Sequence, residues 1–369
     1  MLELPPLSLY IHYPWCVKKC PYCDFNSHEL GNEKGYVSAL LKDLNADFEY
    51  VQGRSIQSIF IGGGTPSLMS VKDLDELFNG LRKKLSFDDQ IEITLETNPG
   101  TFEAEKFYQF NQIGINRLSI GVQSFNDNCL KLLGRIHSAK EAINAIEHAK
   151  ITGFSNINID LMYGLQNQTM SDSISDIEKS IELHPSHISF YQLTIEPNTY
   201  FAKYQPQLPE DDKVWEMGEG GSQILEKYGF ERYEVSAYGR LPSRHNLNYW
   251  QFGDYIGIGA GAHGKITDVD RGQIFRTTKP RAPKDYLRNQ KSSVKMIDNL
   301  PFDFMLNALR LRAGFDCSLF ESRTGNSIKI IREKIDKLNS LGLLEVGNNS
   351  IKPTVKGYNF MNDLQSYFL

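Results

Sequence analysis

Three of the chain's five cysteines lie close together in the stretch WCVKKCPYCDF. Cys16, Cys20 and Cys23 have the spacing C-x3-C-x2-C, which lets one compact loop turn three thiolates toward a common centre. Thiolates are the usual ligands of iron–sulfur clusters, and three of them leave one iron of a four-iron cluster free for a small molecule. Zinc is the alternative, because His28 could complete a structural site with four ligands. The spacing therefore predicts a metal centre and leaves open which metal it holds.

Polar residues also occur where strands should be apolar. Glu96 in TLETNPG, Gln123 in GVQSF and Asp160 in NIDLMYG each interrupt an otherwise apolar run. A buried polar side chain without a partner costs roughly 1–3 kcal/mol, so each of them needs a neighbouring loop or a ligand. Arg135 in LGRIHS could pair with a carboxylate bidentately, or form a surface ion pair. Such residues at the ends of successive strands indicate the lining of a binding site.

A glycine run, GGGTPS, follows one of the apolar stretches and includes Gly63, Gly64 and Thr65. Glycine has no Cβ, so the backbone at such a run can approach a ligand closely. Taken alone, the run indicates a tight turn.

Six expected strands, alternating with helices, position these residues. The strands are expected at 7–13, 58–64, 91–97, 117–124, 156–164 and 187–195, and the helices at 36–50, 71–84, 139–152 and 171–182. This alternation predicts an α/β fold of right-handed parallel βα units, and the number of units fits a partial (β/α)6 barrel better than a closed eight-fold one. A doubly wound sheet stays open as an alternative. In barrels the chemistry lies at the carboxyl ends of the strands, where the cysteines and polar residues fall.

Composition limits the function classes. The 369 residues carry a formal net charge of −5 and a sequence pI of about 6.0, which argues against a general nucleic-acid or anionic-membrane binder. No apolar run is long enough to span a bilayer, and the start MLELPPLSLY lacks the pattern of a signal peptide. An odd number of cysteines without an export signal favours free thiols and a cytoplasmic location.

A C-x3-C-x2-C loop after the first strand of a βα barrel resembles the radical S-adenosylmethionine (SAM) superfamily. The resemblance implies a [4Fe-4S] cluster on the three cysteines, with the open iron chelated by the amino and carboxylate groups of SAM. It also implies that Tyr22 packs on the adenine and that the glycine run meets the methionine amino group. The positions that match those holding the ribose and carboxylate of SAM are Glu96, Gln123, Arg135 and Asp160, with Tyr10 and Gln192 as weaker members.

The motifs YIHYPWCVKKCPYCDF, GGGTPS, GVQSFND, LGRIHS and NIDLMYGLQ together resemble the coproporphyrinogen III dehydrogenase-like (HemN-like) family. The oxygen-independent dehydrogenases of that family carry a fourth cysteine, where the HemW-type haem chaperones have phenylalanine; here the residue is Phe25. His245, Asn246, Tyr249 and Trp250 match the H-N-x-x-Y-W motif of the HemW type, which is associated with haem binding. Imidazole is a standard axial ligand of haem iron, and the two aromatic rings offer flat faces to a porphyrin. The nearby GIGAGAHG adds His263 as a candidate neighbour of the cofactor.

The resemblance implies a haem chaperone that binds a [4Fe-4S] cluster, SAM and haem and passes haem to an acceptor protein. It assigns no catalytic residue. The alternative from the same family is a radical SAM coproporphyrinogen III dehydrogenase, and a zinc-bound regulatory protein is a third reading. The implied partners are haem and an unidentified acceptor, with membrane contact only through that acceptor; no nucleic acid is expected, and a homodimer is left open.

The character of the chain changes past residue 279. An apolar-periodic helix is expected in DFMLNALRLRAGF, followed by a helix, a hairpin and a final helix, in an order that resembles a winged helix. Because its charges are mixed in sign, we interpret this α+β module as a docking or lid module. The expected division is a radical SAM barrel at 1–235, the haem-motif segment and connection at 236–290, and a HemN-like C-terminal domain of winged-helix type at 291–369.

Overall fold

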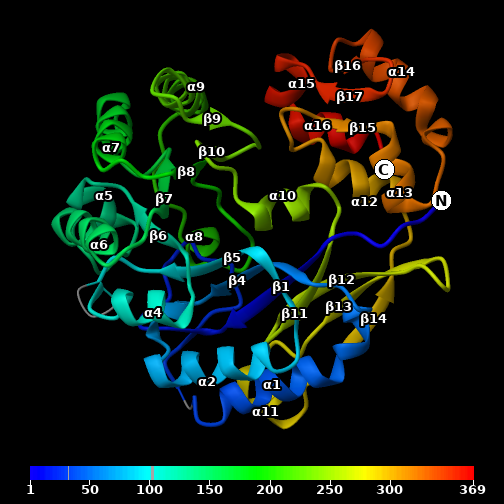
Figure 1. The fold of residues 1–369 in the computed structure, drawn as a ribbon. Helices are drawn as coiled ribbons and strands as arrows, with labels where there is room; N and C mark the ends of the chain where they lie inside the picture. Colours follow the sequence, from blue (N-terminus) through cyan, green and yellow to red (C-terminus); the bar gives the residue numbers. More distant parts are fainter. Residues whose placement is uncertain (32, 101–103) are drawn as a thin grey trace.

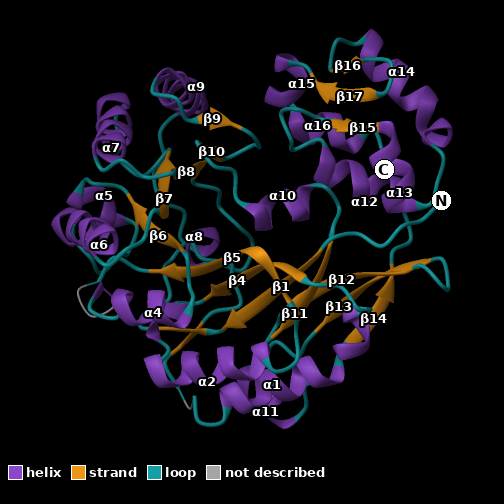
Figure 2. Cartoon of the chain, viewed as in Figure 1, coloured by secondary structure: helices purple, strands orange, loops and turns teal. Residues whose placement is uncertain are grey.

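The computed structural model describes residues 1–31, 33–100 and 104–369 (Figure 1). In this part of the chain a 12-stranded sheet runs in the order β14-β13-β12-β11-β1-β4-β5-β6-β7-β8-β10-β9. Figure 2 shows this sheet curving through the molecule, with helices on its outer face.

Six neighbouring strands of this sheet are parallel and follow one another in chain order. They are β1 (Leu7–Tyr13), β4 (Ile56–Gly63), β5 (Phe87–Thr97), β6 (Arg117–Gln123), β7 (Asn156–Tyr163) and β8 (His187–Gln192). The predicted partial (β/α)6 barrel is thereby confirmed.

Helices cover the outside of these strands. They are α1 (Tyr36–Ala46), α2 (Val71–Arg82), α4 (Phe107–Ile113), α5 (Asp127–Leu132), α6 (Ala139–Ile151), α7 (Met170–Glu182) and α9 (Asp211–Lys227), with 3-10 turns η1 (Phe48–Val51) and η2 (Pro66–Leu68). The short α8 (Tyr200–Lys203) instead contacts the cysteine loop, where the Phe201 N–H donates to the Pro21 carbonyl at 3.1 Å. Helix α6 begins where the sequence predicts, because Ser138 and Glu141 form a reciprocal capping box.

The strands alternate between apolar and polar side chains. On β6, Leu118 and Ile120 belong to the buried core under the helices, whereas Arg117 and Ser119 line a cavity inside the barrel. Strand β7 repeats this pattern. Because successive side chains of a strand point to opposite faces, the apolar core lies between sheet and helices, and the interior of the barrel is polar.

Later segments extend the sheet at both edges. Strand β11 (Asp254–Ile258) pairs parallel with β1, and β12 (His263–Asp268), β13 (Gln273–Thr278) and β14 (Ser293–Met296) follow as antiparallel neighbours, with α11 (Pro283–Arg288) between the last two. At the other edge, β10 (Ala237–Gly239) pairs antiparallel with β8 and β9 (Glu231–Arg232). The sheet thus continues past residue 235, and the division of the chain at 235 and 290 stays a prediction.

The short helix α10 (Arg244–Trp250) lies at the amino ends of the barrel strands. Its Asn248 donates a hydrogen bond to Ser8 of β1 at 2.9 Å, and its His245 ring lies 3.4 Å from the Ser58 hydroxyl of β4. Figure 1 shows α10 between the barrel and the C-terminal module.

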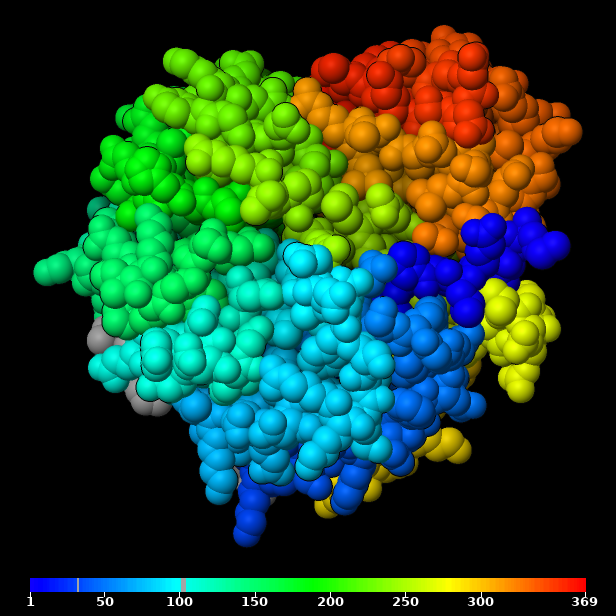
Figure 3. Space-filling model, in the orientation of Figure 1, coloured from blue at the N-terminus to red at the C-terminus, as the bar shows by residue number. Residues whose placement is uncertain are grey.

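The C-terminal module has its own small sheet, in the order β15-β17-β16, and its own apolar core. Its elements are α12 (Leu300–Ala308), β15 (Phe315–Asp316), α13 (Cys317–Thr324), η3 (Ile328–Ile331), α14 (Arg332–Ser340), β16 (Leu344–Val346), β17 (Ser350–Pro353), α15 (Val355–Asn359) and α16 (Met361–Ser366). This is the predicted order of helix, hairpin and helix. In Figure 3 the module, coloured orange to red, packs directly against the rest of the chain. Among the described helices, none has the length and apolar character needed to cross a membrane.

Candidate functional site

The cysteine loop follows β1 and is closed at its base by backbone pairing. Strands β2 (Trp15–Cys16) and β3 (His28–Glu29) are parallel, and the His28 N–H donates to the Pro14 carbonyl at 2.7 Å. Within the loop, the Cys23 N–H donates to the Cys20 carbonyl at 3.1 Å. Backbone hydrogen bonds thus define the loop, and its three cysteines line one cavity.

The thiols lie in surroundings that disfavour their ionisation. Burial is the main cause that raises the pKa of Cys16, to about 11, and that raises the pKa of Cys23. Cys23 Sγ lies 3.6 Å from Ser27 Oγ, and Arg135 Nη1 donates to Cys20 Sγ at 3.7 Å. Thiolates here need a compensating positive charge, which a bound metal cluster supplies.

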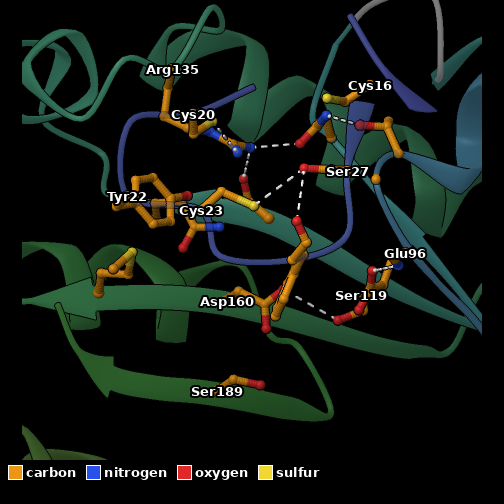
Figure 4. A pocket seen from close by; sticks show the side chains of 18 of the residues that line it. Cys16, Cys20, Tyr22, Cys23, Ser27, Glu96, Ser119, Arg135, Asp160 and Ser189 are labelled. Atoms are coloured by element: carbon orange, nitrogen blue, oxygen red, sulfur yellow. Dashed lines mark hydrogen bonds between the residues drawn. The ribbon is translucent and has the colours of Figure 1, made fainter. Parts of the chain in front are cut away.

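The cavity behind the loop has a volume of ≈ 490 Å³ and opens toward the cysteines (Figure 4). Its lining includes the following residues that were predicted from the sequence: Cys16, Cys20, Tyr22, Cys23, Phe25, Gly63, Gly64, Thr65, Glu96, Gln123, Arg135, Asp160 and Gln192. Figure 4 shows the side chains of Glu96, Asp160 and Arg135 around the same space as the cysteine loop. The structure thus brings the metal-site and polar residues together at one end of the barrel.

Two predicted residues, Tyr10 and His263, are not among the residues that line this cavity. Tyr10 lies in β1, where its hydroxyl bonds to His12 Nδ1 at 2.9 Å and its ring stacks on Phe60 at 6.3 Å between centroids. His263 begins β12, with its Nδ1 3.2 Å from Thr278 Oγ1. Their cofactor roles stay predictions.

The glycine run connects the second strand to the cysteine loop. Gly63 has φ +115°, and a Cβ there would lie 2.6 Å from the His12 ring. The N–H groups of Gly64 and Thr65 donate to the carbonyls of Tyr13 and Trp15, both at 2.7 Å. These contacts explain the glycines: the turn passes so close to the base of the loop that no side chain fits.

Two partly buried carboxyl groups face the cavity. The pKa of Glu96 is raised to about 8, first by burial and then by the charge of Asp160, although the Gly63 N–H donates to Glu96 at 3.0 Å. Burial also raises the pKa of Asp160, which accepts hydrogen bonds from Asn158 at 2.8 Å and Ser119 at 3.3 Å. Carboxyl groups in this state favour a ligand that brings positive charge or hydrogen-bond donors. The amino and sulfonium groups of SAM meet that requirement, so the residues fit this cofactor.

Arg135 joins the cysteine loop to the neighbouring strand ends. Its Nη2 donates to Asn98 Oδ1 at 2.6 Å and to the Gly121 carbonyl at 2.7 Å. Its Nε is buried and has no hydrogen-bond partner among the described residues. Gln123, with φ 71°, accepts a hydrogen bond from Tyr191 at 2.9 Å. Arg135 is therefore anchored, with one donor left over at the cavity.

Several lining residues were missed by the sequence analysis. They include Asn98, Arg117, Ser119, Asn158, Ser189 and Tyr191. The signal was present in RLSIGVQ and NINIDLM, where polar and apolar residues alternate with a period of two. Such alternation in a parallel barrel marks a polar interior.

Zinc finds no support in the geometry. Within residues 1–31, 33–100 and 104–369, no three His, Cys, Asp or Glu side chains form a group that could hold a single metal ion. His28 Nε2 is buried without a hydrogen-bond partner in the same part of the chain, and the loop is closed by the His28 backbone. The resemblance of the cysteine spacing to the radical SAM pattern, rather than this geometry, favours an iron–sulfur cluster over zinc.

The haem-motif residues lie on α10, at the far end of the barrel from the cysteines. His245 does not line the cavity, whereas Asn246 does. The His245 ring stacks on Phe60 at 4.8 Å between centroids, and burial lowers its pKa to about 4, so the imidazole is neutral near pH 7. The rings of Tyr249 and Trp250 contact each other edge to face at 5.1 Å.

Helix α10 is held by one buried carboxylate, Glu92 of β5. Its Oε1 accepts from Ser243 Oγ at 2.9 Å and from the His245 N–H at 3.1 Å, and its Oε2 accepts from the Arg244 N–H at 3.1 Å. A carboxylate at a helix N-terminus satisfies free N–H groups and opposes the helix dipole. The position of the motif helix therefore depends on a residue of the barrel.

Fold and site together define a class of protein. A profile described as "Radical SAM superfamily" matches residues 10–179, and one described as "HemN C-terminal domain" matches residues 298–360. The solved structure described as coproporphyrinogen III oxidase (HemN) from Escherichia coli, a radical SAM enzyme, has a TM-score of 0.83 and covers 99% of this chain and 90% of that one. At 23% identity this likeness establishes the fold alone. The chain is a radical SAM protein with a HemN-type C-terminal domain.

Full-length relatives narrow the class. The chain is 48% identical to "Heme chaperone HemW" of Haemophilus influenzae, over 100% of this chain and 99% of that protein. It is 47% identical to "Heme chaperone HemW" of Escherichia coli (strain K12), over 100% of both. The chain therefore belongs to the HemW family.

Proposed function

We propose that this protein is a haem chaperone, which binds a [4Fe-4S] cluster, SAM and haem and passes haem to an acceptor protein. One observation carries the proposal: three cysteines, a glycine turn and two partly buried carboxyl groups surround a single cavity, and the helix with the H-N-x-x-Y-W motif closes the other end of the same barrel. The names of its full-length relatives support the haem part of the proposal.

Cys16, Cys20 and Cys23 would hold the cluster, and Glu96, Gln123, Arg135 and Asp160 would contact SAM. When bound, the cluster would supply an open iron for the amino and carboxylate groups of SAM. The chain's own part is to position these groups, through the closed loop and the strand ends. Phe25 is 58% exposed at the cavity, so the fold does not require an aromatic ring there for packing.

The partners of this function are haem and its acceptor, and we propose the cytoplasm as its location. All five cysteines are free, which suits a reducing compartment. The net charge of −5 supports a function without nucleic acid.

Anaerobic reconstitution tests the cluster. Cys20→Ala is expected to lose the iron and sulfide that the wild type takes up, whereas Cys129→Ala is the matched control, because that thiol lies on α5 in a separate apolar cluster. Equal iron and sulfide in Cys20→Ala and the wild type would contradict the cysteine assignment.

Optical titration with haem tests the chaperone function. His245→Ala and His245→Gln are both expected to lose the axial-ligand spectrum; if His245 only braces α10, His245→Gln keeps it. Coproporphyrinogen decarboxylation is measured on the same reconstituted samples. Decarboxylation without haem binding would instead establish the dehydrogenase of the same family.

A further inference from the structure

Arg117, the first residue of β6, is a buried cation that the site described above does not use. It is 2% exposed and lines the cavity. Its Nη1 donates to Thr94 Oγ1 at 3.5 Å, and its Nε has no hydrogen-bond partner in the described part of the chain. A guanidinium has five N–H donors in a fixed fork, so a buried arginine with these contacts retains unused hydrogen-bonding capacity.

The nearest carboxylate does not use that capacity. Glu92 Oε2 lies 4.0 Å from Arg117 Nε, too far for a hydrogen bond. Both Glu92 oxygens already accept from the first residues of α10, at 2.9–3.1 Å. Glu92 therefore offsets the charge of Arg117 but leaves its donors available.

The cavity has an ordered distribution of charge. Glu96 and Asp160 lie toward the carboxyl ends of β5 and β7, where they pair in register with Ser119 and Ser189. Arg117 lies two residues earlier on β6 than Ser119, and its register partner on β5 is Thr94. Toward the cysteine loop, Arg135 therefore accompanies the two carboxyl groups, whereas Arg117 is the charged lining residue toward α10, where Asn246 also lines the cavity. This pattern fits a negatively charged group at the deep end.

We infer that Arg117 binds a carboxylate of the ligand that occupies the deep end of the cavity. The planar fork of arginine matches a carboxylate bidentately, and the burial of Arg117 away from water strengthens such a pair. This step rests on the proposed function. The carboxylate is then a propionate of haem, and the haem approaches Arg117 from the side of α10. The carboxylate of SAM has the same chemistry, and the experiment separates the two.

The test compares ligands with and without the carboxylate. Cluster-loaded wild type and Arg117→Gln are titrated optically with haem and with haem dimethyl ester, whose propionates are blocked. The wild type is expected to prefer haem by about tenfold or more, the usual worth of a charge-assisted pair. Arg117→Gln is expected to weaken haem by a similar factor and to leave the ester unchanged, and Arg117→Lys is expected to restore part of the preference.

Arg54→Gln is the matched control, since Arg54 is also largely buried and ion-paired, with Asp254 at 2.8 Å, but does not line the cavity. It is expected to keep the wild-type preference. Thermal unfolding of every variant verifies that it is folded.

Three outcomes would each contradict a different claim: the contact of Arg117 with a carboxylate, the identity of that carboxylate as a propionate, or the proposed function. Equal loss of haem and ester in Arg117→Gln would make Arg117 a structural residue. Weaker binding of SAM, with 5′-methylthioadenosine unaffected because it lacks the carboxylate, would assign Arg117 to the cofactor and overturn the propionate. A wild type that binds neither haem nor the ester would overturn the proposed function itself.

Discussion

Replacing Glu92 by glutamine is expected to loosen α10 without disturbing the cysteine loop. The side chain is 6% exposed and serves three donors of the helix start: Ser243 Oγ, the Arg244 N–H and the His245 N–H. Glutamine retains one accepting oxygen. Its amide nitrogen takes the place of Oε2, which now accepts from the Arg244 N–H, so two hydrogen-bond donors face each other.

The magnitude follows from these contacts. Leaving one buried N–H without an acceptor costs roughly 1–3 kcal/mol, and the remaining bonds weaken because the acceptor is no longer charged. Arg117, 4.0 Å away, also loses its counter-charge. We expect Glu92→Gln to lower the free energy of unfolding by about 2–4 kcal/mol.

Urea-induced unfolding followed by circular dichroism measures this change. Glu141→Gln is the matched control, because Glu141 accepts from the Ser138 N–H at 2.8 Å at the start of α6 but lies partly exposed. Its cost should stay near 1 kcal/mol, about that of losing a helix cap. In Glu92→Gln, iron and sulfide uptake should stay at the wild-type level while haem affinity falls. A free energy of unfolding within about 0.5 kcal/mol of the wild type, a difference typical of surface substitutions, would refute this account of α10.

Three further results are expected. Glu96 has a pKa of about 8 in place of its usual 4.5, so the folded protein keeps a proton that the unfolded chain releases, and stability falls by roughly 3–5 kcal/mol from pH 4.5 to 8. Glu96→Gln should flatten this slope in urea unfolding at several pH values; an unchanged slope would show that Glu96 ionises normally. Gly63→Ala should displace His12, since the new Cβ would lie 2.6 Å from the His12 ring, and should reduce both iron uptake and thermal stability. Wild-type values of both would contradict the close approach of Gly63 to His12. Lys279→Met should lower the free energy of unfolding by about 3–5 kcal/mol, because Lys279 is fully buried between Asp43 and Asp47. This loss should be larger at pH 8 than at pH 5, where the two carboxyl groups can take up protons. A loss that does not depend on pH would argue against buried charges.

The barrel could be predicted from the sequence because its signals are local. Strand β1 was predicted with its observed bounds, and α6 begins at the predicted residue 139. Strand β5 begins at Phe87, earlier than the predicted residue 91, because its first four residues, FDDQ, show no alternation of apolar and polar residues. The pairing of β11 with β1 was not predicted, since it joins residues more than two hundred positions apart and no local signal specifies it.

The site was predictable only in part, because local signals mark some of its residues and not others. Glu96 and Asp160 stand out because they interrupt apolar runs. Glu92 and Arg117 lie nearer the starts of their strands, where charged residues normally reach solvent, and nothing in the sequence shows that α10 covers them. His245 was recognised by its motif, but its stacking on Phe60, a residue that lines the cavity, depends on that covering.

The two ends of the barrel belong to one buried hydrogen-bond chain. Asn158 donates to Asp160 at 2.8 Å, so its oxygen faces His187 Nδ1 at 2.6 Å, and that nitrogen must carry the proton. Burial lowers the pKa of His187 well below its usual value, so the ring is neutral and its Nε2 accepts from the Tyr233 hydroxyl at 2.9 Å. The Tyr233 oxygen in turn accepts from Asn246 of α10 at 3.2 Å.

Every donor in this chain points from the motif helix toward Asp160. Aligned donors polarise one another, so the chain is strongest when Asp160 carries its negative charge. A protonated Asp160 would be a weaker acceptor for Asn158, whose amide group also donates to Ser119 at 2.8 Å. A ligand that stabilises the charge of Asp160 is therefore expected to strengthen the hydrogen bonds that lead to Asn246 of α10.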